Sequence, residues 1–452
     1  MKVALVTHCY FPNHVYGTEV LVAIMARELA ALGHEPVVIS AVFEGEPRQA
    51  TPIVRYEWDG VPVVSIDKNA FPARELGESY DQPAMQPVYL DLLRGIRPDV
   101  VHVFHIMNHT TALLDAAAVL GIPLVATLTD FFGVCLNHRL ETAAGALCTG
   151  PNALRSNCMA CHIKAEAERT RSGRWSMANA SALRPVAATV LAASGRYVPR
   201  MRVSGFRPSD VTARPERLAR AFRNYRAAIA PTSFLRDIYE ANGFPVPLHV
   251  VHFGLDIDRR PKPPPPDEAV TRLAFMGQIA PHKGLHIVLE ALRRVAAPHI
   301  HLTVWGDTAQ DPAYMAHLRS LAEGLPVRFA GRFPRERVAD VLAEADAALI
   351  PSLWYENSPQ SLMEALATHT PVIVTDMPGL TEFVRPSQNG FIVKTGDVAS
   401  MQGVLADIAG RRVDLRGLSL TTAYPRTTRD MALQTLALYP ASPGPEAVAI
   451  AP

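Results

Sequence analysis

The sequence predicts an α/β protein made of two doubly wound domains. The chain has 452 residues, which is too long for one ordinary hydrophobic core. In both halves, short apolar runs of strand length alternate with stretches of helical periodicity. Strands that alternate with helices form mostly parallel sheets, and such sheets bind ligands at the carboxyl ends of their strands.

The first half predicts a Rossmann-like domain over residues 1–258. It opens with a strand, a helix and a second strand, and Gly33 ends the helix. Strands are expected at 3–6, 36–40, 99–104, 123–129, 227–232 and 248–256, with helices at 18–32 and 110–121 and another after Ser233. The rhythm breaks at about 135–226, where we expect an insert that contains four cysteines and many basic residues.

The second half predicts another Rossmann-like domain, over residues 267–430. Strands are expected at 273–277, 301–306, 327–331, 347–352, 371–376 and 390–394. The tract RRPKPPPP at 259–266 is typical of a stiff inter-domain linker. Residues 431–452 are expected to form a C-terminal segment and a loose tail. Two facing domains of this kind would form a cleft at the carboxyl ends of both sheets.

The composition excludes several classes of protein. With 48% hydrophobic and 19% charged residues, the chain is expected to be folded and soluble. A net charge of +1 gives no overall attraction to nucleic acid. No apolar run approaches the ~20 residues of a membrane span. The N-terminus is typical of a first strand and not of a secretory signal, so we expect a cytoplasmic protein.

The most informative segment is PSLWYENSPQSLMEALATHTPVIVTD, residues 351–376. Glu356 follows a strand, Ser358 and Pro359 have the residue types of an N-cap and a first helical position, and Glu364 follows inside the helix. The free N–H groups of the helix start would suit an anion such as a diphosphate. The two carboxylates would then hold hydroxyl groups on either side of it. Taken alone, such a pair is more often a solvated loop acid and an exposed helix acid.

This segment resembles the retaining glycosyltransferases of family 4, which have the GT-B fold. Their hallmark is a Glu, seven residues, a second Glu and an Ala, then a turn into a proline-led strand, as in Glu356, Glu364, Ala365 and Pro371. The downstream run MPGLTEFVRPSQNGFIV also matches, and WYENSP resembles a subgroup common in exopolysaccharide and lipopolysaccharide assembly. The resemblance implies transfer of a sugar from a nucleotide-sugar donor to a saccharide or lipid-linked acceptor, with retained anomeric configuration.

The resemblance also implies roles for residues of the donor site. Glu356 would contact the transferred sugar and Glu364 the ribose of the nucleotide. Lys283, in FMGQIAPHKG, matches the lysine that neutralises the diphosphate, although it would otherwise be an ordinary lysine at a helix start. Gln278 stands where the family usually has an arginine, so one cation is replaced. The candidate donor-binding residues are Gly17, Gln278, Lys283, Glu356, Asn357, Ser358 and Glu364.

The N-terminal part of the resemblance is less complete. The chain keeps Gly17 and Glu19 of a glycine-rich motif at a helix start, where Gly17 would let phosphates approach or would simply form a turn. Thr129 stands in place of a family histidine that orients the reacting sugar, and Asp130 follows it as our candidate for acceptor contact and catalysis. His105 and His109 are nearby and would either replace that histidine or serve as structural groups.

For this family the leaving diphosphate is thought to deprotonate the acceptor, so catalysis would rest on Glu356, Lys283 and Asp130, with no carboxylate nucleophile and no magnesium. Two other readings stay open. One is an epimerase or a phosphorylase with the same fold. The other is a non-catalytic protein that binds nucleotide sugars, which the missing arginine and histidine make conceivable.

Four of the five cysteines form a separate pattern. Cys135, Cys148, Cys158 and Cys161 follow a C-x12-C-x9-C-x2-C spacing, in which the final C-x2-C is typical of a metal knuckle. The lead-in DFFGVC resembles that of family relatives with the same cysteine pattern. A structural zinc site, an iron–sulfur cluster, free thiols and a transient disulfide are all open from the sequence. Cys9 is expected to be a core residue.

Residues 163–226 contain 14 Lys or Arg against 4 Asp or Glu, which is a strong local excess of positive charge. Such a segment would contact anionic lipid head groups at a membrane surface, or would be a solvated, charge-biased region. Few aromatic residues are interleaved for stacking on bases, so nucleic acid is not an expected partner.

Overall fold

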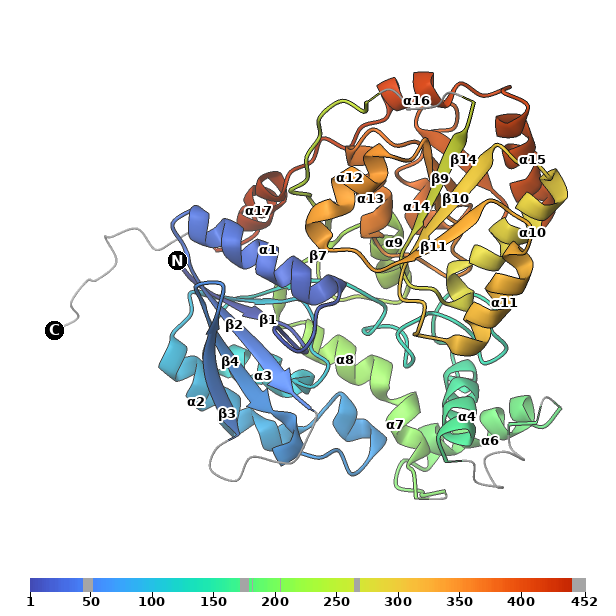
Figure 1. Cartoon of the computed structure of the whole chain (residues 1–452). Helices are drawn as coiled ribbons and strands as arrows, with labels where there is room; N and C mark the ends of the chain where they lie inside the picture. Colours follow the sequence, from blue (N-terminus) through green and yellow to red (C-terminus); the bar gives the residue numbers. More distant parts are fainter. Residues whose placement is uncertain (44–51, 171–178, 181, 204, 264–268, 441–452) are drawn as a thin grey trace. The chain divides into compact units, whose positions relative to one another are not determined.

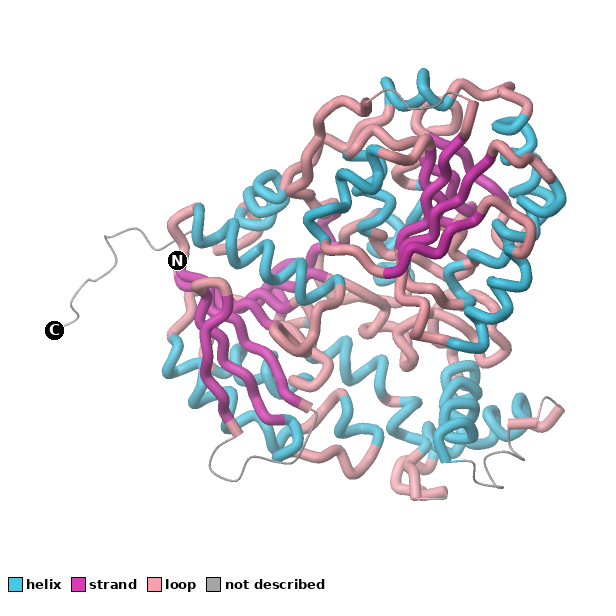
Figure 2. Tube along the Cα trace, viewed as in Figure 1, coloured by secondary structure: helices cyan, strands magenta, loops and turns pink. Residues whose placement is uncertain are grey.

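The computed structural model describes residues 1–43, 52–170, 179–180, 182–203, 205–263 and 269–440. The chain divides into two compact units (Figure 1). The first unit comprises Met1–His252 together with the segment that starts at Thr428, and the second comprises Phe253–Thr427. The expected α/β class with two parallel-rich sheets is confirmed, and in Figure 2 the strands of each unit gather into one sheet.

The sheet of the first unit has eight strands in the order β3-β4-β2-β1-β5-β6-β7-β8. All neighbours are parallel except the β3–β4 pair. The strands are β1 (Lys2–Val6), β2 (Glu35–Val42), β3 (Ile53–Trp58), β4 (Val61–Asp67), β5 (Val100–Val103), β6 (Leu124–Thr127), β7 (Tyr225–Ala230) and β8 (Leu248–Val250). The strand order reverses between β1 and β5, and in such sheets this point is where ligands bind.

The helices of the first unit are α1 (Gly17–Ala31), α2 (Gln86–Ile96), α3 (Thr110–Val119), α4 (Ser156–Thr170), α6 (Arg184–Tyr197), α7 (Pro208–Thr212), α8 (Arg214–Phe222), α9 (Ser233–Ala241) and α17 (Thr428–Leu436). Short 3-10 turns lie at η1 (Lys68–Ala70), η2 (Leu76–Ser79) and η3 (Pro83–Met85). Helices α4, α6, α7 and α8 make up most of the basic insert, and the first three share a small core that includes Met159, Ile163 and Ala192.

The second unit has a six-stranded, fully parallel sheet in the order β11-β10-β9-β12-β13-β14. The strands are β9 (Thr271–Met276), β10 (Ile300–Trp305), β11 (Val327–Gly331), β12 (Ala347–Ile350), β13 (Val372–Thr375) and β14 (Gly390–Val393). The helices are α10 (Leu285–Val295), α11 (Pro312–Ala322), α12 (Val338–Ala343), α13 (Gln360–Ala367), α14 (Pro378–Thr381), α15 (Val398–Ala409) and α16 (Leu415–Thr421), with 3-10 turns η4 (Pro281–Lys283) and η5 (Arg335–Arg337).

Two hydrophobic clusters cover the two faces of this second sheet. Successive strand residues point to opposite faces, so Leu349 belongs to one cluster and its neighbours Ala348 and Ile350 to the other. The first cluster contains side chains of α10, α11 and α15, and the second contains side chains of α12, α13 and α14. The strand order reverses between β9 and β12, which places the loops after these two strands at the switch point.

The passage between the units differs from the expected linker at 259–266. The chain crosses after His252 and again before Thr428. Arg259 is held within the second unit by its guanidinium, which donates to the carbonyls of Leu255 and Arg426 at 2.7 and 2.9 Å. The Lys262 ammonium donates to the carbonyl of Leu342 at 2.9 Å. The linker prediction was therefore wrong for 259–263, because these side chains bind their own domain; residues 264–266 lie outside the described part.

The C-terminal segment also differs from the expected division at residue 430. Helix α17 belongs to the first unit and packs against α1 (Figure 1). Met431 is buried there, and Tyr439 donates its hydroxyl to His102 Nδ1, or accepts from it, at 2.7 Å. The loose tail that the sequence predicts at 441–452 lies outside the described residues. Within the described part of the chain, no helix combines the length and apolar character that crossing a membrane requires.

Candidate active site

Lys283 and Glu356 meet at the switch point of the second sheet. Lys283 lies in η4 after β9, and Glu356 lies in the loop after β12. The Lys283 ammonium donates to Glu356 Oε1 at 2.5 Å, although 73 residues separate the two in the chain. Both side chains are largely buried. The sequence predicted both residues as donor ligands, and the structure brings them together as an ion pair.

Two further groups fix the Glu356 carboxylate. Ser352 donates its hydroxyl to Oε1 at 2.6 Å, and Trp354 donates its indole N–H to the same oxygen at 3.0 Å. The Lys283 ammonium also lies 5.2 Å from the centre of the Trp354 ring, within reach of a cation–π contact. The motif analysis did not single out Ser352 or Trp354, because their roles depend on how the loop folds back on itself.

The loops after β9 and β12 are interlocked. Leu353 donates its backbone N–H to the carbonyl of His282 at 2.8 Å, and the rings of His282 and Trp354 lie 3.9 Å apart. Gly284 has φ +73°, and a Cβ there would lie 1.9 Å from the carbonyl oxygen of Pro351. Only glycine fits this position, because it tolerates both the backbone conformation and the close approach. Lys283 is therefore placed by backbone packing.

Glu364 lies in the middle of α13, four residues after Gln360, the first residue of that helix. Its side chain is only 9% exposed, and its Oε1 lies 3.2 Å from the Arg335 guanidinium. Burial raises the pKa of Glu364, and the charge of Arg335 opposes that shift. Arg335 also donates to the side-chain oxygen of Gln360, the first residue of α13, at 3.1 Å. Sequence reasoning missed Arg335, which places a second positive charge beside this helix start.

The predicted cap of this helix is off by one residue. The helix begins at Gln360 with Pro359 at the N-cap, and Ser358 donates its hydroxyl to Met363 Sδ at 3.7 Å without capping the helix. Asn357 and Ser358 are partly buried in the loop that leads into α13. Gln278 is exposed after β9. These three residues remain predicted donor contacts.

A second polar cluster lies at the switch point of the first sheet. His105 follows β5 and donates from Nε2 to Asp130 Oδ2 at 3.0 Å, while its Nδ1 accepts the backbone N–H of Met107. Asp130 follows β6, and its Oδ1 accepts the N–H of Phe132 at 2.8 Å. Burial alone would raise the pKa of Asp130. The charge and hydrogen bond of His105, together with the charge of His138, lower that pKa below its usual value. Asp130 is therefore a fixed carboxylate.

His109 is a structural residue and does not replace the missing family histidine. It is fully buried, its Nε2 donates to the carbonyl of Thr7 at 2.7 Å, and its Nδ1 accepts from the Tyr89 hydroxyl at 2.9 Å. Burial lowers the pKa of His109 to about 4. Of the two histidines that the sequence offered, His105 is the one in contact with Asp130, and its two ring nitrogens hold that carboxylate and a backbone N–H.

Sequence reasoning missed His8, which follows β1. Its ring lies 4.6 Å from that of His105, and its Nε2 lies 3.4 Å from Oε1 of the buried Glu19. Burial, followed by the charge of His105, lowers the pKa of His8 to about 3. His8 Nδ1 has no hydrogen-bond partner among the described residues. The signal that could have found His8 is its position, two residues after the end of β1, a strand at the switch point.

Gly17 and Glu19 lie at the start of α1. Glu19 Oε2 accepts the backbone N–H of Tyr16 at 3.0 Å, and its Oε1 accepts from Cys9 Sγ at 3.1 Å. Within the described ranges, His8, Cys9 and Glu19 form the one group of three metal-type ligand atoms within 4.8 Å of one another. Their mutual contacts already account for these atoms. Gly17 is exposed, and a Cβ there would meet no atom within 4 Å, so the helix start is open.

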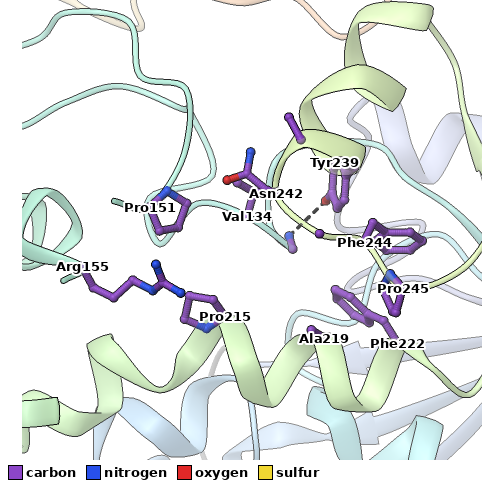
Figure 3. A pocket seen from close by; sticks show the side chains of 13 residues that line it. Val134, Pro151, Arg155, Pro215, Ala219, Phe222, Tyr239, Asn242, Phe244 and Pro245 are labelled. Atoms are coloured by element: carbon purple, nitrogen blue, oxygen red, sulfur yellow. Dashed lines mark hydrogen bonds between the residues drawn. The ribbon is translucent and has the colours of Figure 1, made fainter. Parts of the chain in front are cut away.

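A cavity of about 230 Å³ lies beside the Asp130 loop of the first unit (Figure 3). Its lining includes Pro151, Pro215, Phe222 and Tyr239 (Figure 3). The Tyr239 hydroxyl accepts the N–H of Gly133 and donates to the carbonyl of Asp130, both at 3.0 Å. Tyr239 thus connects this cavity to the backbone that carries Asp130, and the cavity is lined by residues between Gly133 and Pro245.

Both units match models of known glycosyltransferase families. Residues 15–143 match the model described as Glycosyltransferase Family 4, and residues 270–409 match the one described as Glycosyl transferases group 1. Together the two matches cover more than half of the chain. The chain belongs to the GT-B glycosyltransferases of family 4. Its donors are therefore nucleotide sugars, and the predicted fold and family are confirmed.

Individual relatives agree with this family. A GDP-mannose-dependent alpha-mannosyltransferase from Mycolicibacterium smegmatis is 26% identical over 395 residues, which are 87% of this chain and 84% of that protein. A glycosyltransferase structure from Rickettsia africae superposes with a TM-score of 0.62 at 13% identity and covers 97% of each chain. A sucrose-phosphate synthase from Thermosynechococcus elongatus superposes with a TM-score of 0.59 at 16% identity, over 97% of this chain and 98% of that one. The two structures show the shared fold.

Proposed function

We propose that this glycosyltransferase transfers a sugar from a nucleotide sugar to an acceptor hydroxyl with retained anomeric configuration, and that its second unit holds the donor. One observation carries the proposal. Lys283 and Glu356 are joined at 2.5 Å at the switch point of the second sheet, beside the start of α13, which carries the buried Glu364. This combines a cation, a helix start and two fixed carboxylates in one place.

Each group in this place suits one part of a donor. An ammonium has three N–H donors, so Lys283 can hold Glu356 and a phosphate oxygen at the same time. The free N–H groups of α13 provide further anion binding. Glu356 then binds hydroxyls of the transferred sugar, and Glu364 binds the ribose. Gln278 is uncharged and stands where the family usually has an arginine. Arg335, which lies 3.1 Å from Gln360 at the helix start, supplies the missing positive charge.

The chemistry needs little more from the protein than position and charge. The sugar–phosphate bond breaks, and the departing diphosphate takes the proton of the acceptor hydroxyl on the same face of the sugar. Lys283 and the α13 N–H groups stabilise the negative charge that builds up on the diphosphate. No carboxylate nucleophile is required, in contrast to a retaining hydrolase. In the first unit, His105 positions Asp130, which binds the acceptor.

The acceptor in this proposal is a saccharide or a lipid-linked glycan at an anionic membrane surface. Helix α6 exposes the apolar side chains of Val186 and Val190 and the aromatic ring of Tyr197, by 61–75%. Arg196 and Arg200 are exposed beside them. Apolar side chains next to arginines suit a surface of anionic lipids, since the apolar groups enter the head-group region and the arginines bind phosphates.

The donor proposal is tested by thermal-shift screening of UDP-, GDP- and ADP-sugars, followed by transfer assays. The charge-neutral Glu356→Gln should reduce kcat by at least about 100-fold, because the variant loses the charge that binds Lys283 and the sugar. Glu344→Gln, at an exposed acid of the same unit, is the control and should keep wild-type activity. Full turnover by Glu356→Gln would contradict the proposal, and the anomeric form of the product, read by NMR, tests retention.

The membrane part is tested with vesicles. The wild-type enzyme should bind vesicles that contain anionic lipids, less so as salt is raised, and should not bind neutral ones. Val186→Ser combined with Val190→Ser should weaken this binding several-fold. Leu420→Ser serves as the control, because Leu420 is an equally apolar and 85% exposed residue of the second unit. Equal binding by both variants would assign the interaction to another surface.

A further inference from the structure

The four cysteines of the insert converge on one small cavity in the first unit. Cys135, Cys148, Cys158 and Cys161 all line it, together with Asn137, Glu141 and Asn157. The five cysteines of the chain are free thiols. Cys135 and Cys161 are far apart in the sequence. The segment between them folds back through a short β-bridge between Glu141 and Leu147. The fold itself gathers the four thiols.

Three local structures bring the thiols to this cavity. A turn after Phe131 carries Cys135, whose N–H donates to the Phe131 carbonyl at 2.7 Å. The bridged loop carries Cys148, whose N–H donates to the carbonyl of Leu140 at 2.7 Å. Cys158 and Cys161 lie three residues apart at the start of α4, on one face of that helix. The Cys161 sulfur is 3.5 Å from the carbonyl of Glu141, so α4 lies against the bridged loop.

Polar groups of the surrounding loop contact two of the sulfurs. The Cys135 thiol donates to Asn137 Oδ1 at 2.7 Å, and the backbone N–H of Arg139 donates to the same oxygen at 3.2 Å. Gly150 donates its N–H to Cys148 Sγ at 3.4 Å, and Asn157 donates its amide to the same sulfur at 3.7 Å. Donors of this kind stabilise thiolates more than thiols, and they are the outer contacts that orient the ligands of a metal.

We propose that Cys135, Cys148, Cys158 and Cys161 bind one zinc ion as four thiolates, and that this ion ties the loop 128–155 to α4. Four thiolates suit zinc or an iron–sulfur cluster. Zinc is the simpler of the two, because a single ion takes all four thiolates in one closed tetrahedral site, and the metal analysis below distinguishes it from a cluster.

Binding requires the thiols to close in. A tetrahedral zinc site with Zn–S bonds of about 2.3 Å places its sulfurs about 3.8 Å apart. In the structure, no three of the four sulfurs lie within 4.8 Å of one another. Side-chain rotation of cysteines that line the same small cavity supplies this closure.

The proposal is tested on the full-length enzyme purified without a histidine tag. Elemental analysis should find one zinc per chain, and a mercurial reagent that blocks thiols should release zinc in proportion to the four thiols modified. Refolding with Co²⁺ should produce the intense visible absorption of a tetrahedral tetrathiolate site. A metal-free protein whose four thiols all react at once would overturn the proposal. Iron with acid-labile sulfide would overturn the assignment to zinc.

Matched variants separate this site from the catalytic site. Cys158→Ser combined with Cys161→Ser should lose the zinc and lower the melting temperature, whereas Cys9→Ser should keep the zinc, since Cys9 lies outside the cavity. If the double variant does not fold, release of zinc from the wild-type enzyme still tests the proposal. All these readouts are independent of transfer activity, so failure of the proposed function would not affect them.

Discussion

Gly284 shows how one residue positions the proposed donor site. Its φ of +73° suits glycine, and an added Cβ would lie 1.9 Å from the carbonyl oxygen of Pro351. Gly396 has nearly the same backbone conformation, φ +70°, but its Cβ would meet Leu353 only at 4.0 Å. The two glycines therefore separate the cost of backbone conformation from the cost of a collision between two loops.

We predict that Gly284→Ala destabilises the second unit by about 3 kcal/mol and weakens donor binding, because the loops after β9 and β12 must separate. Gly396→Ala should cost only about 1 kcal/mol, since it bears the conformational strain alone. Urea unfolding and titration with the donor found by screening measure both effects. Equal losses in the two variants would show that the contact with Pro351 does not position Lys283.

Sequence and structure agree unevenly at the residue scale. Lys283, Glu356 and Glu364 were predicted because they match the residue types and spacing of a family motif, which can be recognised in the sequence alone. Ser352, Trp354, Arg335 and His8 were not singled out, because their contacts arise from loop packing. Arg335 pairs with Glu364, which is 29 positions away, and no local pattern of residue types predicts such a pair.

At the scale of elements, the parallel strands were predictable from the sequence, whereas one hairpin and the place of the last helix were not predicted. The six strands of the second sheet lie where the apolar runs predicted them. The β3–β4 hairpin was missed, although Asp59-Gly60 between two alternating runs is a strong hairpin signal, and both residues have positive φ. The return of α17 to the first unit depends on contacts with α1 that no local pattern encodes.

The end of the chain beyond α17 gives a prediction at this scale. Tyr439 is 5% exposed, and its hydroxyl bonds to the fully buried His102, whose other nitrogen bonds to Thr127 at 2.7 Å. Tyr439→Phe should cost about 1–3 kcal/mol, because it leaves His102 Nδ1 buried without a partner. Thermal unfolding of the first unit measures the loss. Tyr197→Phe, at an exposed tyrosine of the same unit, is the control and should have no effect.

At the scale of the whole molecule, the order of the strands explains both candidate sites. Each sheet reverses its strand order once, between β1 and β5 and between β9 and β12. His8, His105 and Asp130 follow strands at or beside the first reversal, and Lys283 and Glu356 follow strands at the second. The sequence predicted the two sheets from alternation alone. It misplaced the linker at 259–263, because no residue pattern encodes the contacts by which Arg259 and Lys262 bind the second unit.

Buried neutral histidines make the stability of the molecule depend on pH. Burial is the main cause that lowers the pKa of five histidines of the first unit to about 3 or 4, namely His8, His102, His109, His138 and His162. In the unfolded chain these groups titrate near 6.5. The unfolded state therefore binds more protons than the folded state below that pH, so the free energy of unfolding falls as pH drops from 6.5 toward 4.

His109 isolates one such contribution, since it is fully buried and both its nitrogens are bonded. With a folded pKa of about 4, it should remove about 2 kcal/mol of stability between pH 7 and pH 5. His109→Gln cannot titrate, so its unfolding free energy, although lower at pH 7, should depend less on pH by that amount. Hydrogen exchange of β1 and β5 at the two pH values measures this difference. Parallel pH profiles for wild type and variant would show that His109 is not the buried neutral group that its contacts indicate.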